Sequence, residues 1–559
     1  MKTCSRLASS FGWILLIVLG ELFFFRDLFT PGAMLGDGGD ARLYQLILEH
    51  WLHVFQGREP WDTLSEFYPF SGTLGYTDTF LGQAILYVPL RLLNFDMFSA
   101  YKITMVVWHA VGCLALFIFL GCFLKLERKA AFLGASAFFW ANGFALILSY
   151  SRMQIMALSL LPVFLVLAAW AVQEHRVLLR IALGIASVLV LALTAYSGWY
   201  VFYFAVLFVV VWLVCLAISV YFENNVDFRK IGRFFCAHIA EALVYVAVFC
   251  LALWPLLSLY WPVAQRCGMR EWEIVNLGLP QLSDVINMGA GNFTLGWFFR
   301  LNDFSMWRVK LENEVCQGYS LVFWALVIYL AWCYLRRRSA FAFPTTDQSE
   351  FGTFRHLVIR SLGVATAFSF VLIISFGSCS LWWFFWKFMP GASSLRFMGR
   401  WWLFLLLPFS ILVAYLINYH KCNRIWYVFL ITFTLWLSNI YGAPLTHWNA
   451  IEQVSFLAEM PQPPSQAKVI AVYSSDNQKT KKRAWDFQLD AWLIADHFGL
   501  QTVNGYSGQF TPNFELLWDS SESSSFVGNL AKYKALNGIA DTVYLYDEAS
   551  ATWRPDTNL

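Results

Sequence analysis

Long apolar runs alternate with short polar segments over most of the chain. A run of about 20 mostly apolar residues is long enough to cross a bilayer as a helix. Such runs occupy residues 11–29, 98–124, 131–148, 154–173, 181–196, 200–222, 234–262, 318–335, 359–378, 401–418 and 425–442. The pattern therefore predicts an all-α polytopic membrane protein with about eleven transmembrane helices.

The composition agrees with this pattern. Of the 559 residues, 59% are hydrophobic and 13% are charged, and the mean hydropathy is +0.55. Soluble domains carry roughly 25% charged residues, so a water-soluble enzyme is excluded. The net charge is +3, and the basic residues form short clusters between apolar runs. This distribution is a topology signal and not a nucleic-acid footprint, so we expect no nucleic-acid partner.

Positive charge orients the predicted helices. Cytoplasmic loops are enriched in Lys and Arg, and 17 of the 39 basic residues fall in only 66 positions, at 1–10, 125–130, 174–180, 223–233, 336–360 and 419–425. We place these segments and the N terminus in the cytoplasm. An odd number of crossings then puts the C terminus outside, in a protein of the inner or cytoplasmic membrane. Pro31 and an acidic loop follow the first apolar run in place of a cleavage site, which favours a retained helix over a signal peptide.

All large polar segments then lie outside the cytoplasm. We divide the chain into a membrane domain, 1–442, with outer loops at 30–97 and 263–317, and a small extracytoplasmic α/β domain, 443–559. In that domain, 467–473 and 542–546 are expected strands, and 486–498 and 526–536 are expected helices. The inner loops are too short for a nucleotide-binding domain of about 100 residues, so any chemistry is expected at the outer face.

Two cysteines share the second outer loop. Cys267 and Cys316 would meet an oxidising compartment there. They are candidates for a disulfide. Because the chain has no C-x-x-C pair, we do not expect structural zinc.

Two carboxylates stand in a glycine-rich stretch directly after the first helix. Asp37 and Asp40 lie in the sequence GDGGD, and a helical pattern with Leu43, Ile47 and Trp51 on one face follows. In one interpretation, Asp40 caps this helix and Asp37 occupies a turn. In the other, a carboxylate at the outer membrane surface accepts a proton from an acceptor hydroxyl.

The order of four motifs resembles the GT-C superfamily of integral-membrane glycosyltransferases, in a bacterial branch that includes YfhO-like proteins. The motifs are GDGGD at 36–40, FYPFSGTLGYTDTFLGQAILYVPL at 67–90, PGASSLRFMGRW at 390–401 and VNGYSG at 503–508. They extend over nearly the whole chain. Met398 and Gly399 depart from the Pro-containing stretch expected in the third motif.

The resemblance implies a GT-C-like fold and transfer of a sugar from a polyprenyl-phosphate-linked donor to a cell-envelope glycan, such as a lipopolysaccharide, at the outer face of the membrane. It gives Asp40, or alternatively Asp37, the role of general base or substrate-orienting carboxylate. Some members of the superfamily use a divalent metal and others do not, so the resemblance leaves metal dependence open. It also leaves open whether the configuration at the anomeric carbon is inverted or retained.

Other residues near the same face are candidates for binding. Negative charge that grows on a leaving phosphate needs cations, and Arg152, Arg396 and Arg400 are available, although arginines at helix ends also snorkel to lipid headgroups. Arg396 and Arg400 would share one face if their stretch is helical. Candidate substrate-binding residues are Asp78, Glu49, His53 and Tyr506. Glu49 and His53 have a spacing that suits a metal ion, but a solvated helix face is the simpler interpretation.

Two other functions compete with the transferase. Glu21, His109, His238 and Glu241 are ionisable groups in apolar runs, as a transporter or flippase of lipid-linked saccharides would need. The sequence shows no inverted repeat, which argues against this class. A non-catalytic envelope assembly protein would use VNGYSG in the tail as a binding surface.

Overall fold

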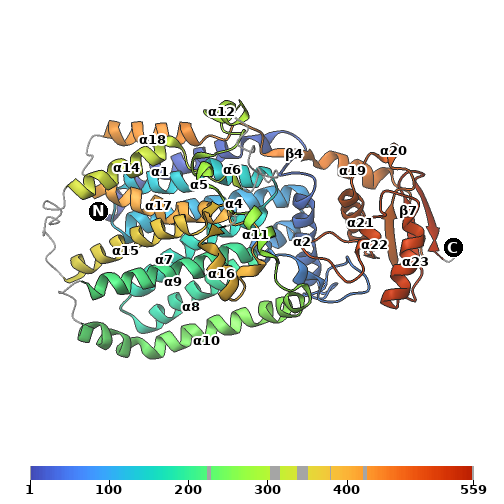
Figure 1. Ribbon diagram of the computed structural model, residues 1–559, viewed down its shortest axis with the longest axis horizontal. Helices are drawn as coiled ribbons and strands as arrows, with labels where there is room; N and C mark the ends of the chain where they lie inside the picture. The colour runs from blue at the N-terminus through green and yellow to red at the C-terminus, as the bar shows by residue number, and fades with distance from the viewer. Residues whose placement is uncertain are drawn as a thin grey trace.

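The computed structural model describes residues 2–222, 228–301, 315–336, 350–377, 379–419 and 425–556, and most of them are helical (Figure 1). The main helices of the bundle are α1 (Lys2–Phe24), α4 (Met97–Ile118), α5 (Arg128–Phe139), α6 (Asn142–Ser149), α7 (Leu160–Gln173), α8 (Val177–Ser197), α9 (Trp199–Tyr221), α10 (Phe228–Cys267), α14 (Leu321–Arg336), α15 (Glu350–Leu372), α17 (Arg400–Tyr419) and α18 (Ile425–Asn439).

Further elements connect these helices. They are α2 (Asp40–Phe55), α3 (Leu81–Leu92), α11 (Trp272–Leu277), α12 (Gly296–Leu301) and α16 (Trp382–Phe388), the 3-10 helices η1 (Arg26–Phe29), η2 (Thr73–Tyr76), η4 (Met153–Ser159), η5 (Leu282–Ile286) and η7 (Ala392–Ser394), the π-helix η3 (Phe119–Phe123), and the strands β1 (Ala33–Leu35), β2 (Ser375–Phe376) and β3 (Cys379–Ser380).

Within the described residues, seven helical segments are long and apolar enough to cross a membrane. They are Met97–Phe123, Arg128–Ser149, Met153–Gln173, Val177–Ser197, Trp199–Tyr221, His238–Cys267 and Arg400–Asn418. The other four predicted windows overlap α1, α14, α15 and α18, so the count of eleven stays a prediction. Residues 223–227, 337–349 and 420–424 of the predicted inner segments, and 302–314 of the second outer loop, lie outside the described residues.

The start of α17 is fixed by two buried indoles. The side chains of Trp401 and Trp402 are fully buried, and their N–H groups donate to the carbonyl oxygens of Ser369 (2.8 Å) and Phe370 (3.1 Å) in α15. A buried indole N–H is costly without an acceptor. These bonds therefore fix the position of α17 along the axis of α15. They also fix the position of Arg400, which is the first residue of α17.

The segment between α1 and α4 and the carboxyl-terminal part of the chain lie at the same end of the bundle (Figure 1). Strand β1 pairs antiparallel with β4 (Thr446–Asn449). Helix α2 packs against α3 and against α21 (Ala484–Phe498) of the carboxyl-terminal part. Because α2 is covered from several sides, most of its residues are buried.

The carboxyl-terminal part contains a four-stranded sheet in the order β6-β5-β7-β8. Strand β5 (Val469–Tyr473) runs parallel to β6 (Gln501–Thr502) and β7 (Val543–Asp547), and β8 (Thr552–Pro555) is antiparallel to β7. The other elements of this part are α19 (Ala450–Glu459), α20 (Asn477–Thr480), α22 (Glu515–Trp518) and α23 (Phe526–Asn537).

The sheet is covered on both faces. Side chains of β5 alternate: Ile470 and Val472 pack with residues of α21, whereas Val469, Ala471 and Tyr473 pack with residues of α22 and α23. Phe67, from the segment between α2 and η2, is fully buried in the core formed with α22 and α23. The boundary at residue 442 stays a prediction, since both parts share this core.

The predicted disulfide is absent from the structure. Cys267 is an exposed free thiol at the end of α10, whereas Cys316 is buried, with its side chain 3.3 Å from where a Cβ at Gly289 would lie. Proximity in the same loop of the sequence therefore did not bring the two sulfurs together.

Candidate functional site

Asp40 is the first residue of α2, and its carboxylate does not cap the helix. The N-cap position belongs to Gly39, and no side chain makes a capping bond there. The capping interpretation of Asp40 is therefore wrong. Instead, the carboxylate accepts a hydrogen bond from the guanidinium of Arg152, and its Oδ1 accepts one from the Tyr506 hydroxyl at 2.7 Å. Arg152 precedes η4 in the helical bundle, whereas Tyr506 comes from VNGYSG in the carboxyl-terminal part.

Asp37 occupies a turn and is tied to Ser151. Its Oδ1 accepts from the Gly39 backbone N–H at 3.0 Å and from the Ser151 hydroxyl at 2.7 Å. Gly36 approaches Ser151 so closely that a Cβ there would lie 2.2 Å from the Ser151 Oγ, and its φ is +82°. A glycine is the residue that fits both demands. The GDGGD stretch thus brings Asp37 and Asp40 against the loop that contains Ser151 and Arg152.

The surroundings of Asp40 favour a carboxylate that can take up a proton. Burial raises the pKa of Asp40 above its ordinary value, although Arg152 and the Tyr506 hydroxyl oppose that rise. Asp37 raises it further, and Arg400 lowers it. A raised pKa makes the ionised carboxylate a stronger base. Its side chain is 21% exposed, so it is within reach of a bound group.

Arg400 is buried on the side of the site formed by the membrane helices. It is 3% exposed, and its guanidinium carbon lies 5.1 Å from the ring centroid of Tyr200. Its charge acts on both Asp40 and Asp78. Asp78 accepts from the Trp199 backbone N–H at 2.8 Å, at the start of α9, and burial raises its pKa to about 6. The charge of Arg400 thus reaches both candidate carboxylates, Asp40 and Asp78.

Arg396 differs from this group in its exposure. Helix α17 begins at Arg400, so Arg396 lies outside the helix and the condition for a shared helix face is not met. Arg396 is exposed, and its guanidinium lies over the ring of Phe397, 4.6 Å from the centroid. Its backbone N–H donates to the Tyr200 hydroxyl at 2.7 Å. The guanidinium of Arg400 also lies near the Phe397 ring, 5.5 Å from its centroid, so the two arginines share that ring.

Glu49 and His53 are buried, contrary to the expected solvated helix face, because α3 and α21 cover this side of α2. Their ligand atoms and that of Asp496 lie within 4.8 Å of one another. The Glu49 carboxylate already accepts from the Tyr87 hydroxyl and from Arg91 Nε at 2.6 Å. A divalent cation here would have to displace the Arg91 guanidinium. A cation at Asp40 would likewise have to displace Arg152. Glu49, His53 and Asp496 are therefore a candidate metal-binding triad whose use requires Arg91 to move.

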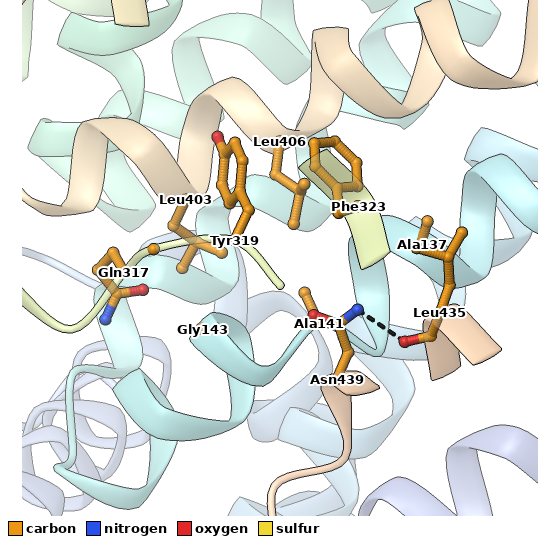
Figure 2. Close-up of a pocket in the computed structure, with 11 residues that line it drawn as sticks. Ala137, Ala141, Gly143, Gln317, Tyr319, Phe323, Leu403, Leu406, Leu435 and Asn439 are labelled. Carbon is orange, nitrogen blue, oxygen red and sulfur yellow. Dashed lines mark hydrogen bonds between the residues drawn. The ribbon is translucent and has the colours of Figure 1, made fainter. Parts of the chain in front are cut away.

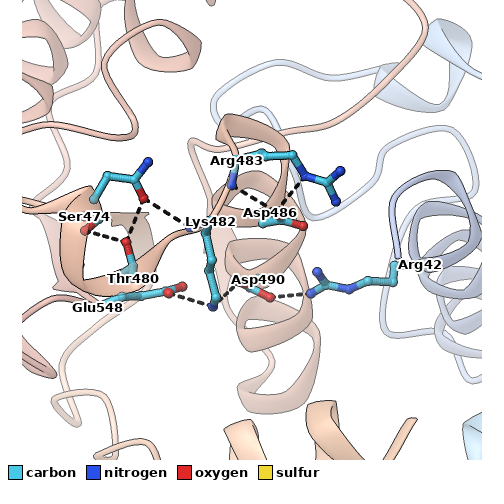
Figure 3. Close-up of polar contacts among 9 residues, drawn as sticks. Arg42, Ser474, Thr480, Lys482, Arg483, Asp486, Asp490 and Glu548 are labelled. Carbon is cyan, nitrogen blue, oxygen red and sulfur yellow. Dashed lines mark hydrogen bonds and ion pairs between the residues drawn. The ribbon is translucent and has the colours of Figure 1, made fainter. Parts of the chain in front are cut away.

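Sequence reasoning missed Glu66 and the contact between Arg42 and Asp490. Glu66 is 1% exposed, and its Oε2 accepts from the Tyr506 backbone N–H at 2.8 Å. The Asp490 carboxylate binds both Arg42 of α2 and Lys482, as Figure 3 shows. Glu66, Arg42 and Asp490 lie outside the four motifs. The contacts of Glu66 with Tyr506 and of Arg42 with Asp490 join residues hundreds of positions apart, which local periodicity cannot predict.

A small pocket inside the helical bundle is separate from these residues (Figure 2). Gln317 lines it, together with apolar groups such as Tyr319, Phe323 and Leu403, and Asn439 is bonded to its own helix through the Leu435 carbonyl at 2.7 Å. No residue that lines this pocket is charged or belongs to the predicted site.

Comparison with known proteins gives a fold and no sequence family. No protein-family profile and no curated protein matches the chain. The structure of the Archaeoglobus fulgidus oligosaccharyltransferase in the apo form gives a TM-score of 0.50 at 12% identity, covering 96% of this chain and 69% of that chain. Oligosaccharyltransferase AglB from the same organism, in complex with an inhibitory peptide and a dolichol-phosphate, gives 0.51 at 11% identity, covering 97% and 69%.

ArnT from Cupriavidus metallidurans, bound to undecaprenyl phosphate, gives a TM-score of 0.40 at 12% identity, covering 96% of this chain and 93% of that chain. The likeness in fold rests on the two oligosaccharyltransferase structures. With the seven apolar helices, they support an integral membrane protein. The chain shares its overall fold with the two oligosaccharyltransferase structures.

Proposed function

We propose that this protein is a membrane glycosyltransferase that takes a sugar from a polyprenyl-phosphate-linked donor and transfers it to a cell-envelope glycan at the outer face of the membrane. The observation that carries the proposal is the position of Asp40. It lies between the membrane helices and the carboxyl-terminal part, bound by Arg152 from one and Tyr506 from the other. The fold shared with an oligosaccharyltransferase that was solved with a dolichol-phosphate supports the same class of donor.

The reaction needs one base and one cation. Asp40 removes the proton from an acceptor hydroxyl, and the acceptor oxygen forms a bond to the anomeric carbon of the donor sugar. The bond between that carbon and the phosphate oxygen breaks, and its electron pair leaves with the lipid phosphate. Arg400, whose charge already acts on Asp40 and Asp78, balances the negative charge that grows on the phosphate. Asp37 is the alternative base.

Charges inside the bundle have structural partners that a transport role does not require. Glu21 is bonded to His109 Nδ1 at 2.6 Å and to the Trp140 indole N–H at 3.0 Å. Glu241 is bonded to Arg180 through two contacts of 2.9 and 2.5 Å. Such pairs offset the cost of placing charge in an apolar environment, and they favour the transferase over a flippase.

Replacing Asp40 with Asn tests the proposal. The substitution keeps the size of the side chain but removes the base, so envelope glycan composition should match that of cells without the protein, at unchanged membrane expression. Glu241→Gln is the control, because it neutralises a charge in the bundle far from any proposed chemistry. Unaltered glycans in cells that carry both Asp37→Asn and Asp40→Asn would refute the enzyme assignment.

A further inference from the structure

The contacts of Tyr506 connect two parts of the chain at Asp40. Its hydroxyl donates to Asp40 Oδ1 at 2.7 Å, and its backbone N–H donates to Glu66 Oε2 at 2.8 Å. Its ring stacks on Trp518, with centroids 6.1 Å apart and planes 20° from parallel. Both ends of the residue and its ring are therefore fixed, which leaves the hydroxyl little freedom to turn away from Asp40.

The loop that contains Tyr506 is itself held against the segment between α2 and η2. The Phe67 backbone N–H donates to the Asn504 carbonyl and the Tyr68 N–H to the Thr502 carbonyl, both at 2.9 Å. Gly505 lies so close to Phe67 that a Cβ would approach its ring to 2.3 Å. These contacts are made by main-chain atoms and a fully buried ring, so the loop has one well-defined position.

Glu66 is a buried carboxyl group that accepts a hydrogen bond from this loop. It is 1% exposed, and its Oε1 has no partner in the described part of the chain. Burial raises the pKa of Glu66 well above its usual range. A buried polar group without a hydrogen bond lowers the stability of a protein. The one hydrogen bond described for Glu66 is to the backbone N–H of Tyr506, and it fixes that backbone.

We infer that Tyr506 is a positioning residue for the reaction proposed above: the carboxyl-terminal part supplies the hydroxyl that orients the Asp40 carboxylate and stabilises its ionised form, and Glu66 holds Tyr506 in place. A hydroxyl that donates to a carboxylate favours the charged state. The other groups that act on Asp40 are Arg152, Asp37 and Arg400. None of these three residues comes from the carboxyl-terminal part. Among the groups that act on Asp40, Tyr506 is therefore the one through which that part stabilises the ionised carboxylate.

The inference rests on the proposed function, but its test needs no sugar donor. A hydrophobic carbodiimide reacts with protonated carboxyl groups, and mass spectrometry of the full-length protein in detergent measures the adduct on Asp40 as the pH is varied. Tyr506→Phe keeps the ring and removes the hydroxyl. We expect the midpoint of Asp40 labelling to move to higher pH by about one unit, with Asp40→Asn unlabelled at that position.

Tyr68→Phe is the matched control. The Tyr68 hydroxyl also donates to a carboxylate, Asp541, in the same contact between the two parts of the chain, but it does not reach Asp40. In Tyr68→Phe, the pH midpoint of Asp40 labelling should equal that of the wild type. Glu66→Leu, which cannot accept from Tyr506, should shift the midpoint in the same direction as Tyr506→Phe. If one variant fails to fold, the other still tests the inference.

An unchanged Asp40 midpoint in a folded Tyr506→Phe or Glu66→Leu protein would overturn the inference, even where Asp40→Asn abolishes glycan transfer. Conversely, a shifted midpoint together with normal transfer in Asp40→Asn would support the positioning contact and remove Asp40 as the base. The two failures are thus distinguishable.

Discussion

Arg42 and Asp490 lie 448 positions apart in the sequence but form an ion pair in which the two side chains are only 8% and 6% exposed. Asp490 also binds Lys482 Nζ at 2.7 Å, and Lys482 binds Glu548 at 2.6 Å (Figure 3). Although burial opposes ionisation, Arg42 and Lys482 lower the pKa of Asp490. This chain of alternating charges fastens α21 to α2, two residues after Asp40.

Asp490→Asn should therefore weaken the attachment of the carboxyl-terminal part. Arg42 and Lys482 would keep their charges but lose the carboxylate between them, and breaking a buried pair costs about 3–5 kcal/mol. Thermal unfolding in detergent and limited proteolysis measure the loss. Arg483→Gln is the control, since Arg483 pairs with Asp486 while 65% exposed and should change stability by less than about 1 kcal/mol. Equal losses in both variants would contradict the attachment role.

The contact between α2 and α21 should loosen as the pH rises from about 5 to about 8. Burial and the charge of Glu49 raise the pKa of Asp496 to about 7, and the pKa of His53 is also raised: burial lowers it, but Glu59 and Asp496 more than compensate. Both groups hold protons in the folded state that the unfolded state releases, so stability falls with rising pH. Glu59, with its pKa lowered to about 2, acts only in more acidic solution.

Proteolysis of the folded protein at pH 6 and pH 8 measures this effect, with faster cleavage expected at pH 8. Asp496→Asn should reduce the difference between the two pH values, because the amide does not ionise. A pH dependence that is the same in Asp496→Asn and wild type would show that other groups control the contact.

Arg400 and Arg396 should differ sharply in their effect on activity. Arg400→Gln removes a buried cation whose charge reaches Asp40, and loss of one group that stabilises transition-state charge costs about 100-fold or more in rate. Arg396→Gln removes an exposed cation and should cost only a few-fold. Glycan transfer at matched membrane expression compares them. A larger loss in Arg396→Gln would instead place the phosphate at the exposed loop before α17.

Gly505 and Gly508 offer a packing test within one motif. A Cβ at Gly505 would meet the Phe67 ring at 2.3 Å, whereas the nearest atom to a Cβ at Gly508 is the Tyr76 carbonyl oxygen at 3.8 Å. Overpacking typically costs 1–3 kcal/mol, so Gly505→Ala should destabilise the protein by about 2 kcal/mol and Gly508→Ala by less than about 0.5 kcal/mol. Equal midpoints of thermal unfolding would show that Phe67 moves aside.

Much of the fold follows from local pattern. Apolar runs place helices over α4 to α10 because a helix in lipid must be apolar along its length, and β5 and β7 lie within stretches rich in β-branched and aromatic residues. The sequence by itself also indicated Asp37 and Asp40 as candidates, through their position in GDGGD after the first apolar run, and Arg400 as a candidate cation, whereas the approach of Gly36 to Ser151 is seen only in the structure.

Tertiary structure alone decided which of these groups meet. Asp40 and Tyr506 are 466 positions apart, and a periodicity of two or 3.6 residues carries no record of such a partner. The same reason explains Glu49 and His53: their spacing on α2 is local, but their burial depends on α21, which covers them. Local pattern determines elements, whereas packing between distant segments determines which side chains become a site.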